Sequence, residues 1–331
     1  MYYYHSLDFD GELIFCDASE DTLTSELVAG AIKRGQCLIK YRHSASRPWE
    51  SVAECLDLSS SGFAALTCDD DFLVPTTIQK CIEFLTHNPS YSSVHGKAII
   101  AESRSLQNRI DAAGNYRLPV RSESTGLLRL RKSGYEYGVN LFSVHPIHIF
   151  RRMCDGSAKF DPEFSCSDWE LSQEILPNLL SAVYGKSFEF SDLYLVRQIH
   201  SQRHKTHKYV EWAASPGWRR SYTYVINHLA AAIVQVDGCV QSLAEDTAVT
   251  SLEGYISVFR RKSSCANVTR LKFISRIRYL LDVFGLRHIA ASIRNMLFPK
   301  PIDERVTLDI ILEPCHPYHH DFSRVLQSVE G

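Results

Sequence analysis

The sequence predicts an α/β protein followed by a helical C-terminal region, and two observations carry that prediction. In the first part of the chain, short apolar runs alternate with segments whose apolar residues recur at the spacing of a helix. After about residue 205 the helical spacing takes over, in the stretches 209–243 and 268–297. The 331 residues are enough for one large domain and an extension. We therefore predict a sheet-containing domain over residues 1–205 and a mostly helical region over 206–331.

The elements at the start of the chain alternate without interruption. Residues 12–16 are apolar, end at Asp17 and are typical of a buried strand. Pro48 falls in the first turn of a predicted helix, where proline is favoured. Strands that alternate with helices across short connections pair in parallel, so we expect parallel pairing through this region. The predicted strands are 12–16, 37–41, 62–67 and 92–101, and the predicted helices between them are 23–32, 48–58 and 75–85.

The remainder of the first part is less regular. Residues 103–143 contain many Gly, Arg and Tyr residues and few long periodic stretches, which indicates loops and short strands. A helix is predicted over 168–184, broken near Pro177, and a short strand over 193–199.

Composition argues against several classes of protein. A net charge of −2 disfavours a dedicated nucleic-acid binder, which needs a strong positive field. None of the 10 cysteines forms a Cys-x-x-Cys pair, which disfavours a zinc ribbon or thioredoxin-type site, and their usage favours a reducing compartment. The start of the chain does not resemble a signal peptide, and no uncharged apolar run reaches about 20 residues. We expect a cytoplasmic protein, either soluble or peripheral at the membrane.

Acidic residues fall where two predicted strands end. Asp17 follows the first strand, and the run Asp69-Asp70-Asp71 follows the third. Ligands of open α/β sheets bind beyond the carboxyl ends of the strands. Three adjacent carboxylates repel one another unless a cation or a hydrogen-bond network compensates, and Mg²⁺ or Mn²⁺ commonly bridges carboxylates to substrate phosphates. A solvated acidic turn is the alternative explanation of the run.

The acidic run also carries a family resemblance. Asp-Asp-Asp-Phe-Leu-Val-Pro, followed by Phe84-Leu85, Asn88-Pro89 and Gly96, resembles the DxD region of family 2 glycosyltransferases, which have the GT-A fold. Residues 13–21 resemble that family's earlier strand, which ends in an Asp-x-Ser-x-Asp pattern. The resemblance covers roughly residues 10–205. It implies a mixed sheet of GT-A type flanked by helices, and transfer of a sugar from a nucleotide-diphosphate donor, with inversion at the anomeric carbon.

The resemblance implies a role for each acidic position. Asp17 matches the residue that contacts the nucleotide base or ribose. Asp69 matches the first DxD carboxylate, near the ribose and the metal, and Asp71 matches the ligand of a Mn²⁺ or Mg²⁺ ion that holds the diphosphate. Asp70 lies between them in the same cofactor-binding run.

Two further segments match parts of the family's site. Residues 164–170 resemble the segment with the catalytic base, for which we prefer Asp168 over Glu170; both could instead cap the following helix. His200 matches a late histidine that completes the metal ligands in several GT-A enzymes, and Arg197 could pair with diphosphate oxygens. The alternative for these last two is a basic surface loop.

One difference from the family leads to two alternative predictions of function. The family begins with an additional strand that helps to form the nucleotide pocket, and the resemblance implies that this strand is missing or replaced here. A nucleotide-sugar binder without catalytic activity is therefore the first alternative. A phosphotransferase with an aspartate nucleophile is the second, although that class would place its Asp-x-Asp on the first strand.

The stretch 260–300 is basic, with Asp282 as its only acid, and its apolar residues recur at helical spacing. Such a helix can lie on an anionic membrane surface or pack its apolar face on the protein, and we prefer packing. The acceptor of the transferred sugar could be a glycan, a lipid-linked molecule or a protein.

Overall fold

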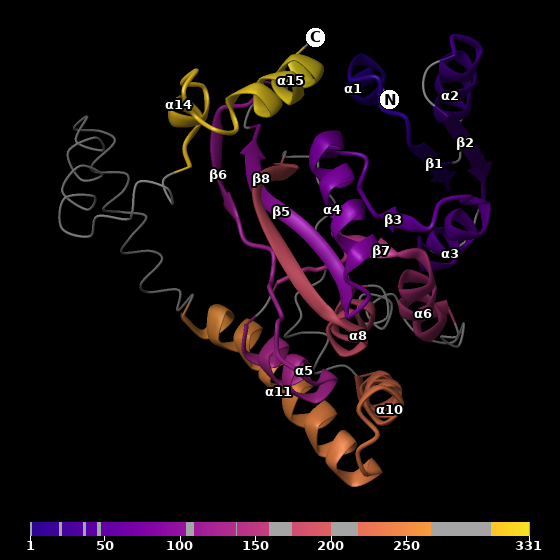
Figure 1. Ribbon diagram of the computed structural model, residues 1–331, viewed down its shortest axis with the longest axis vertical. Helices are drawn as coiled ribbons and strands as arrows, with labels where there is room; N and C mark the ends of the chain where they lie inside the picture. The colour runs from indigo at the N-terminus through magenta and orange to yellow at the C-terminus, as the bar shows by residue number, and fades with distance from the viewer. Residues whose placement is uncertain are drawn as a thin grey trace, which may run out of the picture.

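A curved sheet forms the centre of the molecule, with helices on both of its sides (Figure 1). The computed structural model describes residues 2–19, 22–35, 38–44, 48–103, 109–136, 138–158, 174–199, 218–265 and 306–330. The predicted site residues Asp168, Glu170 and His200, and all but the start of the basic stretch 260–300, lie outside the described residues.

The first elements form a small unit beside the central sheet. Helix α1 (Tyr2–Ser6) precedes this unit, which consists of β1 (Glu12–Asp17), α2 (Leu23–Lys33), β2 (Leu38–His43) and α3 (Pro48–Leu58). β1 and β2 pair in parallel, with Glu12 opposite Leu38 and Asp17 opposite His43. The predicted strands and helices of this region are confirmed. β1 and β2 form a two-stranded sheet of their own among the described residues.

The central sheet has six strands in the order β3-β7-β5-β8-β4, with β6 also paired to β5. The long strands β5 and β8 pair in parallel, and the other pairs are antiparallel, so the predicted α/β fold with a mixed sheet is confirmed. The strands are β3 (Phe63–Ala65), β4 (Asp71–Leu73), β5 (Tyr91–Glu102), β6 (Ala112–Tyr116), β7 (Val144–Pro146) and β8 (Lys186–Ile199).

The structure corrects one expectation about pairing. The alternation of strands and helices predicts that the third strand continues the parallel arrangement of the first two, but β3 pairs antiparallel with β7. β3 is only three residues long, and its partner lies far along the chain. An apolar run predicts a strand but not the strand beside it, because partner choice depends on long-range packing.

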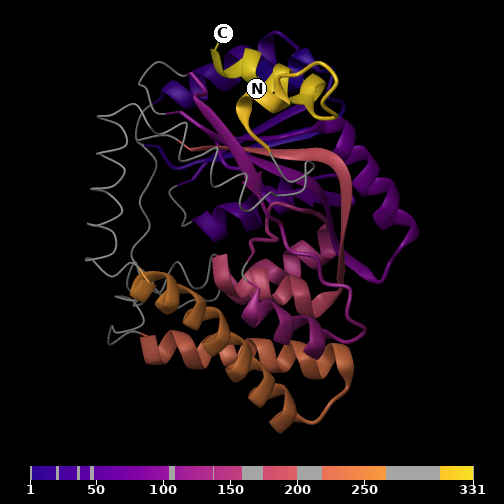
Figure 2. The same ribbon diagram turned by 90° about the vertical axis from the view of Figure 1, so that its left-hand side faces the viewer.

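Helices cover the sheet and extend below it (Figure 2). They are α4 (Pro75–His87), α5 (Gly126–Tyr135), α6 (Ile147–Ala158), α8 (Leu176–Tyr184), α10 (Trp218–Asp237), α11 (Gln241–Cys265), α14 (Leu308–Ile311) and α15 (His319–Glu330). α10 and α11 pack against α5 and α8 at the end of the molecule opposite α15. The predicted helical C-terminal region is confirmed for the described residues.

One helix was not predicted from the sequence. The prediction of loops and short strands over 103–143 missed α5, whose N-terminus is capped by a residue from a distant helix, as described below. The stretch 209–243 is helical as predicted over its described residues, where α10 ends at Asp237 and α11 begins at Gln241. Gly238 has a φ of 63°, a left-handed conformation that ends a helix and favours glycine.

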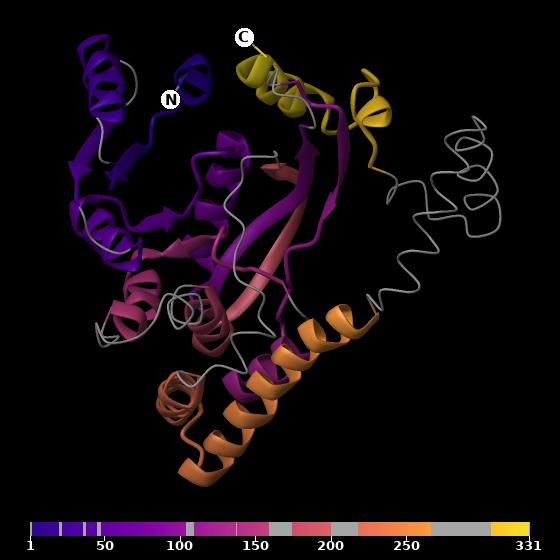
Figure 3. The same ribbon diagram turned by 180° about the vertical axis from the view of Figure 1, so that it is seen from behind.

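The chain ends pack together at one end of the sheet. The C-terminal segment 306–330 lies beside α1, and both chain ends lie at the same end of the molecule (Figure 3). Tyr3 of α1 and Phe322 and Val325 of α15 are buried in one apolar cluster with Val196 of β8. This cluster fixes α1 against the part of the sheet where the acidic run begins β4.

Candidate functional site

The acidic run forms a turn that leads into β4. The backbone N–H of Asp71 donates to the carbonyl of Cys68 at 3.3 Å, and the N–H of Gln198 donates to the carbonyl of Asp70 at 3.3 Å. Asp71 is then the first residue of β4 and lies opposite Arg197 of β8. Asp69 is exposed, Asp70 is half-buried and Asp71 is 5% exposed. The turn therefore directs its three carboxylates to different depths, and only Asp71 enters the protein.

Asp71 and Arg197 form a buried ion pair. Arg197 Nε lies 3.8 Å from Asp71 Oδ2, and the exposed fractions of the two side chains are 14% and 0%. The guanidinium group donates from Nη1 to the hydroxyl of Tyr116 at 2.8 Å and lies over the rings of Tyr116 and Phe142. Burial disfavours the charged guanidinium, but Tyr116 and Asp71 outweigh it and hold the pKa of Arg197 above its usual value. Arg197 is therefore charged and fixed in position.

Three side chains of the turn could approach one cation. Ligand atoms of Cys68, Asp70 and Asp71 lie within 4.8 Å of one another, the only such group among the described residues. Carboxylate oxygens suit Mg²⁺ or Mn²⁺. Burial of the sulfur and the Asp71 carboxylate raise the pKa of the Cys68 thiol to about 12, although the residue as a whole is exposed. A protonated thiol is a poor ligand for a hard cation, so the two carboxylates are the fitting donors.

The predicted metal pair was Asp69 and Asp71, completed by His200. The side chains that the turn brings together are those of Asp70 and Asp71, and Asp69 is not a member of this group. His200 lies outside the described residues. The roles assigned to Asp69 and His200 stay predictions.

Asp17 lies at the end of β1 in a separate hydrogen-bond network. Its Oδ1 accepts from the backbone N–H of Ser19 at 3.0 Å and from the Ser19 hydroxyl, and its Oδ2 accepts from Tyr41 at 2.9 Å. The ring Nε2 of His43 lies 2.9 Å from the carbonyl of Ser19. The Ser19 hydrogen bonds are the main reason that the pKa of Asp17 lies below its usual value. Asp17 is thus an ionised, oriented acceptor at the edge of the small sheet.

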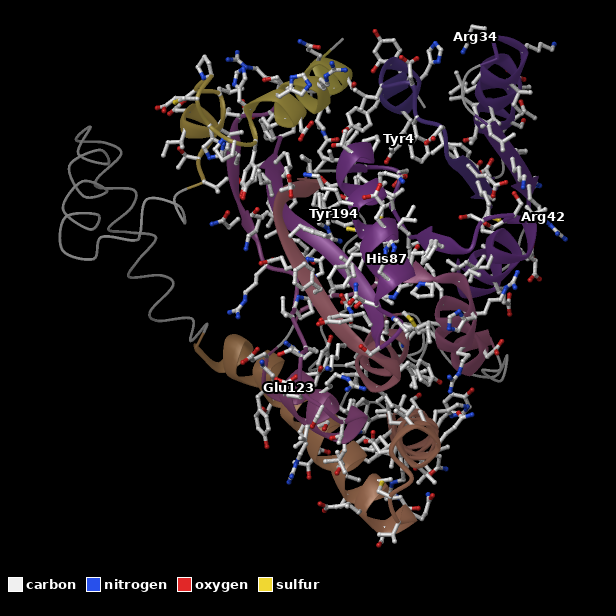
Figure 4. All side chains as sticks on the ribbon, viewed as in Figure 1. Tyr4, Arg34, Arg42, His87, Glu123 and Tyr194 are labelled. Atoms are coloured by element: carbon white, nitrogen blue, oxygen red, sulfur yellow. The ribbon has the colours of Figure 1, made fainter. Side chains whose placement is uncertain are left out.

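Aromatic residues near the acidic turn were missed by the sequence analysis. The backbone N–H of Leu73 donates to the hydroxyl of Tyr4 at 3.1 Å, and the ring of Tyr3 meets that of Phe72 edge-on. Figure 4 shows Tyr4 and Tyr194 in the interior and Arg34 and Arg42 at the periphery. The signal that could have found α1 is the cluster of tyrosines at positions 2–4, of which Tyr3 and Tyr4 are buried and Tyr2 is exposed.

No protein-family model matches the chain, and no curated protein matches it in sequence. Solved structures of S. aureus TarS are similar to it in fold. TarS 1–349 in complex with UDP is 15% identical with a TM-score of 0.44, and the match covers 96% of this chain and 80% of that one. TarS 1–349 is 12% identical, with a TM-score of 0.37 and coverages of 76% and 82%. TarS is 13% identical, with a TM-score of 0.35 and coverages of 75% and 49%.

Proposed function

We propose that this chain is a metal-dependent glycosyltransferase that moves a sugar from a nucleotide-diphosphate donor to an acceptor hydroxyl. The observation that carries the proposal is the acidic turn, in which the Asp70 and Asp71 carboxylates approach each other beside the buried Arg197. This arrangement suits a metal ion bound to a diphosphate. The two carboxylates can bind the metal ion, and the guanidinium group of Arg197 can pair with the anionic oxygens of the diphosphate. The resemblance of residues 66–96 to the DxD region supports the same assignment.

Each residue of the proposed site binds a different part of the donor. Asp70 and Asp71 would hold Mn²⁺ or Mg²⁺, with His200 completing the ligands. When bound, this cation offsets the charge on the departing diphosphate. Arg197 pairs with diphosphate oxygens, and the exposed Asp69 accepts from the ribose. Asp17 receives the base or ribose through a lone pair not used by Ser19 and Tyr41.

The acceptor hydroxyl requires a base. We assign this role to Asp168, with Glu170 as the second candidate, on the resemblance of residues 164–170 to the family's base segment. The carboxylate takes the proton of the hydroxyl as its oxygen attacks the anomeric carbon from the face opposite the diphosphate. Attack from that face inverts the anomeric configuration.

Metal-dependent binding of UDP or GDP tests the donor site. We expect titration calorimetry to show binding in Mn²⁺ and none in EDTA. Asp71→Asn should lose this binding, because an amide does not neutralise the cation. Asp70→Asn should lose it too and disturbs the buried ion pair less. Asp57→Asn, at a side chain that is 79% exposed on α3, is the control and should bind as the wild type does. Unchanged Mn²⁺-dependent binding in both site variants would remove the turn from the metal site.

A nucleotide-sugar binder without turnover is the second candidate. The observation that favours it is the separation of β1 and β2 from the six-stranded sheet, since the resemblance puts Asp17 and the acidic run on one nucleotide pocket. Release of UDP or GDP from a panel of nucleotide sugars decides between the two. Tight metal-dependent binding without release of nucleotide, in the presence of glycan, lipid-linked and protein acceptors, would favour the binder.

A further inference from the structure

Two cysteines of the small N-terminal unit lie in direct contact. The sulfur atoms of Cys16, on β1, and Cys55, on α3, are 2.7 Å apart. That separation is longer than a disulfide bond of about 2.05 Å, yet shorter than two sulfur atoms adopt when they merely touch. Both residues are half-buried, so a small reagent can reach them. The backbone thus already holds the two thiols where a covalent bond can form.

Polar contacts hold β1 to its neighbours: Glu12 pairs with Lys40 at 2.6 Å and accepts from the backbone N–H of Ser60 at 2.9 Å. No residue of β1 is fully buried, and a two-stranded sheet is marginally stable by itself. Polar contacts tie α3 to the other strand: Arg42 of β2 pairs with Glu54 at 2.9 Å, and Lys40 donates to the carbonyl of Leu58 at 2.8 Å. On the β1 side of α3, Cys55 meets Cys16. A bond between these sulfur atoms would therefore join α3 to β1 covalently.

We propose that Cys16 and Cys55 form a reversible disulfide that fixes β1, and with it the adjacent Asp17, in its binding position. This inference rests on the proposed function only for the consequence at Asp17. The oxidant is a small-molecule disulfide. One cysteine thiolate attacks the oxidant, whose sulfur–sulfur bond breaks and releases one thiol; the second cysteine thiolate then attacks the mixed disulfide and releases the other. The two cysteines lose two electrons and two protons, and the oxidant becomes two thiols.

The position of the pair couples it to the nucleotide site. Cys16 precedes Asp17 in β1, and Asp17 is hydrogen-bonded to Tyr41 across the small sheet. A cross-link closing a loop of 39 residues removes much of the freedom of this segment in its locally unfolded form. The disulfide orders β1 before the ligand arrives. Ligand binding is then no longer opposed by the conformational entropy that would be lost in ordering β1. Oxidation is therefore expected to tighten nucleotide binding.

Treatment of the full chain with oxidised glutathione tests the cross-link. We expect a digest without reductant to contain one peptide pair joined through Cys16 and Cys55, which dithiothreitol separates. Hydrogen exchange of the amides in β1 and β2 should slow by about tenfold or more on oxidation, whereas exchange in α11 should not change. Cys16→Ser and Cys55→Ser should each abolish the slowing. Cys315→Ser, at an exposed cysteine of the C-terminal segment, should retain it.

Two results would overturn the proposal: absence of the joined peptides, or slowing of exchange that persists in both serine variants. UDP titration of the reduced and oxidised forms then tests the coupling. We expect affinity several-fold higher in the oxidised form, and equal affinities would refute the effect at Asp17. If the cross-link forms and protects β1 while neither form binds UDP or GDP, the disulfide stands and the proposed glycosyltransferase function fails.

Discussion

Single residues of the acidic turn differ in burial although they are adjacent in sequence. Asp69 is exposed and Asp71 is 5% exposed, because β4 begins at Asp71 and pairs it with Arg197. A buried carboxylate needs a nearby positive charge, and breaking such a pair leaves the remaining charge uncompensated. This environment explains why Asp71 and Arg197 act as one unit, whereas Asp69 is free to contact ligands from the solvent side.

The proposed catalytic base, Asp168, gives the first prediction at this scale. Asp168→Asn should lower kcat by about 100-fold or more with little change in donor affinity, because a base acts on the acceptor in the transition state. Steady-state kinetics and UDP calorimetry measure the two effects separately. Glu170→Gln is the matched variant and should keep most of the activity. Full turnover in Asp168→Asn together with loss of turnover in Glu170→Gln would make Glu170 the base. A large drop in the melting temperature of Asp168→Asn without loss of turnover would indicate that Asp168 caps a helix.

Glu12 gives the second prediction, which concerns pH. Its carboxylate accepts from Lys40 at 2.6 Å and from the backbone N–H of Ser60 at 2.9 Å. Burial opposes ionisation, but these hydrogen bonds prevail and lower the pKa of Glu12 from 4.5 to about 2. A carboxyl group whose pKa falls on folding stabilises the protein above its unfolded pKa, and that contribution is lost as the pH falls through the folded pKa.

Glu12→Gln should therefore melt at a lower temperature than the wild type above pH 4.5, and the gap should narrow as the pH falls toward 2. Thermal melts across this range measure the gap. Glu245→Gln, at an exposed position of α11, is the control and should show little difference at any pH. A gap for Glu12→Gln that is constant with pH would contradict the ion pair as its cause.

At the scale of elements, helix α5 shows how a distant residue decides a local structure. Its first N–H groups, those of Gly126 and Leu127, donate to the two carboxylate oxygens of Asp237 at 2.8 and 2.7 Å. Thr125 caps the same helix end by accepting from Leu128 at 3.2 Å. The N–H groups at the start of a helix have no acceptors within that helix. Asp237, the last residue of α10, supplies the acceptors for α5.

Asp237→Ala should lower the free energy of unfolding by about 1–2 kcal/mol, since it removes both acceptors and a negative charge at a helix N-terminus. Urea unfolding followed by circular dichroism measures this loss. Asp246→Ala removes an exposed carboxylate from α11 and should have little effect. Equal stabilities of the two variants would mean that α5 does not depend on Asp237.

At the scale of the whole molecule, the two ends of the chain pack against each other. Residues 306–330 pack beside α1 and against β8, so both ends of the chain contribute to the cluster next to the acidic turn. A second and larger core joins the sheet to α5, α8, α10 and α11. In the described part of the chain, no helix is long and apolar enough to cross a membrane.

The basic stretch 260–300 gives the prediction at this scale. We expect little binding of the full chain to anionic vesicles at low or high salt, and a marked loss of thermal stability in Leu281→Asp, because an apolar helix face packed on protein would receive an unpaired charge. Vesicle co-sedimentation and thermal melting make the two measurements. A membrane-facing helix would instead give binding that weakens steeply with salt, at about 1 kcal/mol for each basic residue near the surface, with an unshifted melt.

The sequence by itself determined the local elements and the position of the acidic run. Apolar runs and helical spacing predicted β1, β2, α2, α3 and α4, because these patterns depend on residues close in the chain. The same reasoning placed Asp17 at the carboxyl end of a strand, as observed. It placed Asp71 after a strand, whereas Asp71 begins β4, a strand that was not predicted. It failed over α5, since capping by Asp237 comes from a helix about a hundred residues away.

Only the tertiary structure decided which of these elements meet. It paired β3 with β7, placed Arg197 opposite Asp71 and brought Cys16 to Cys55. None of these contacts leaves a periodic pattern in the sequence, because each joins residues whose spacing along the chain is set by intervening elements. Their formation depends on how the buried faces pack as a whole, and that packing is a property of the complete chain.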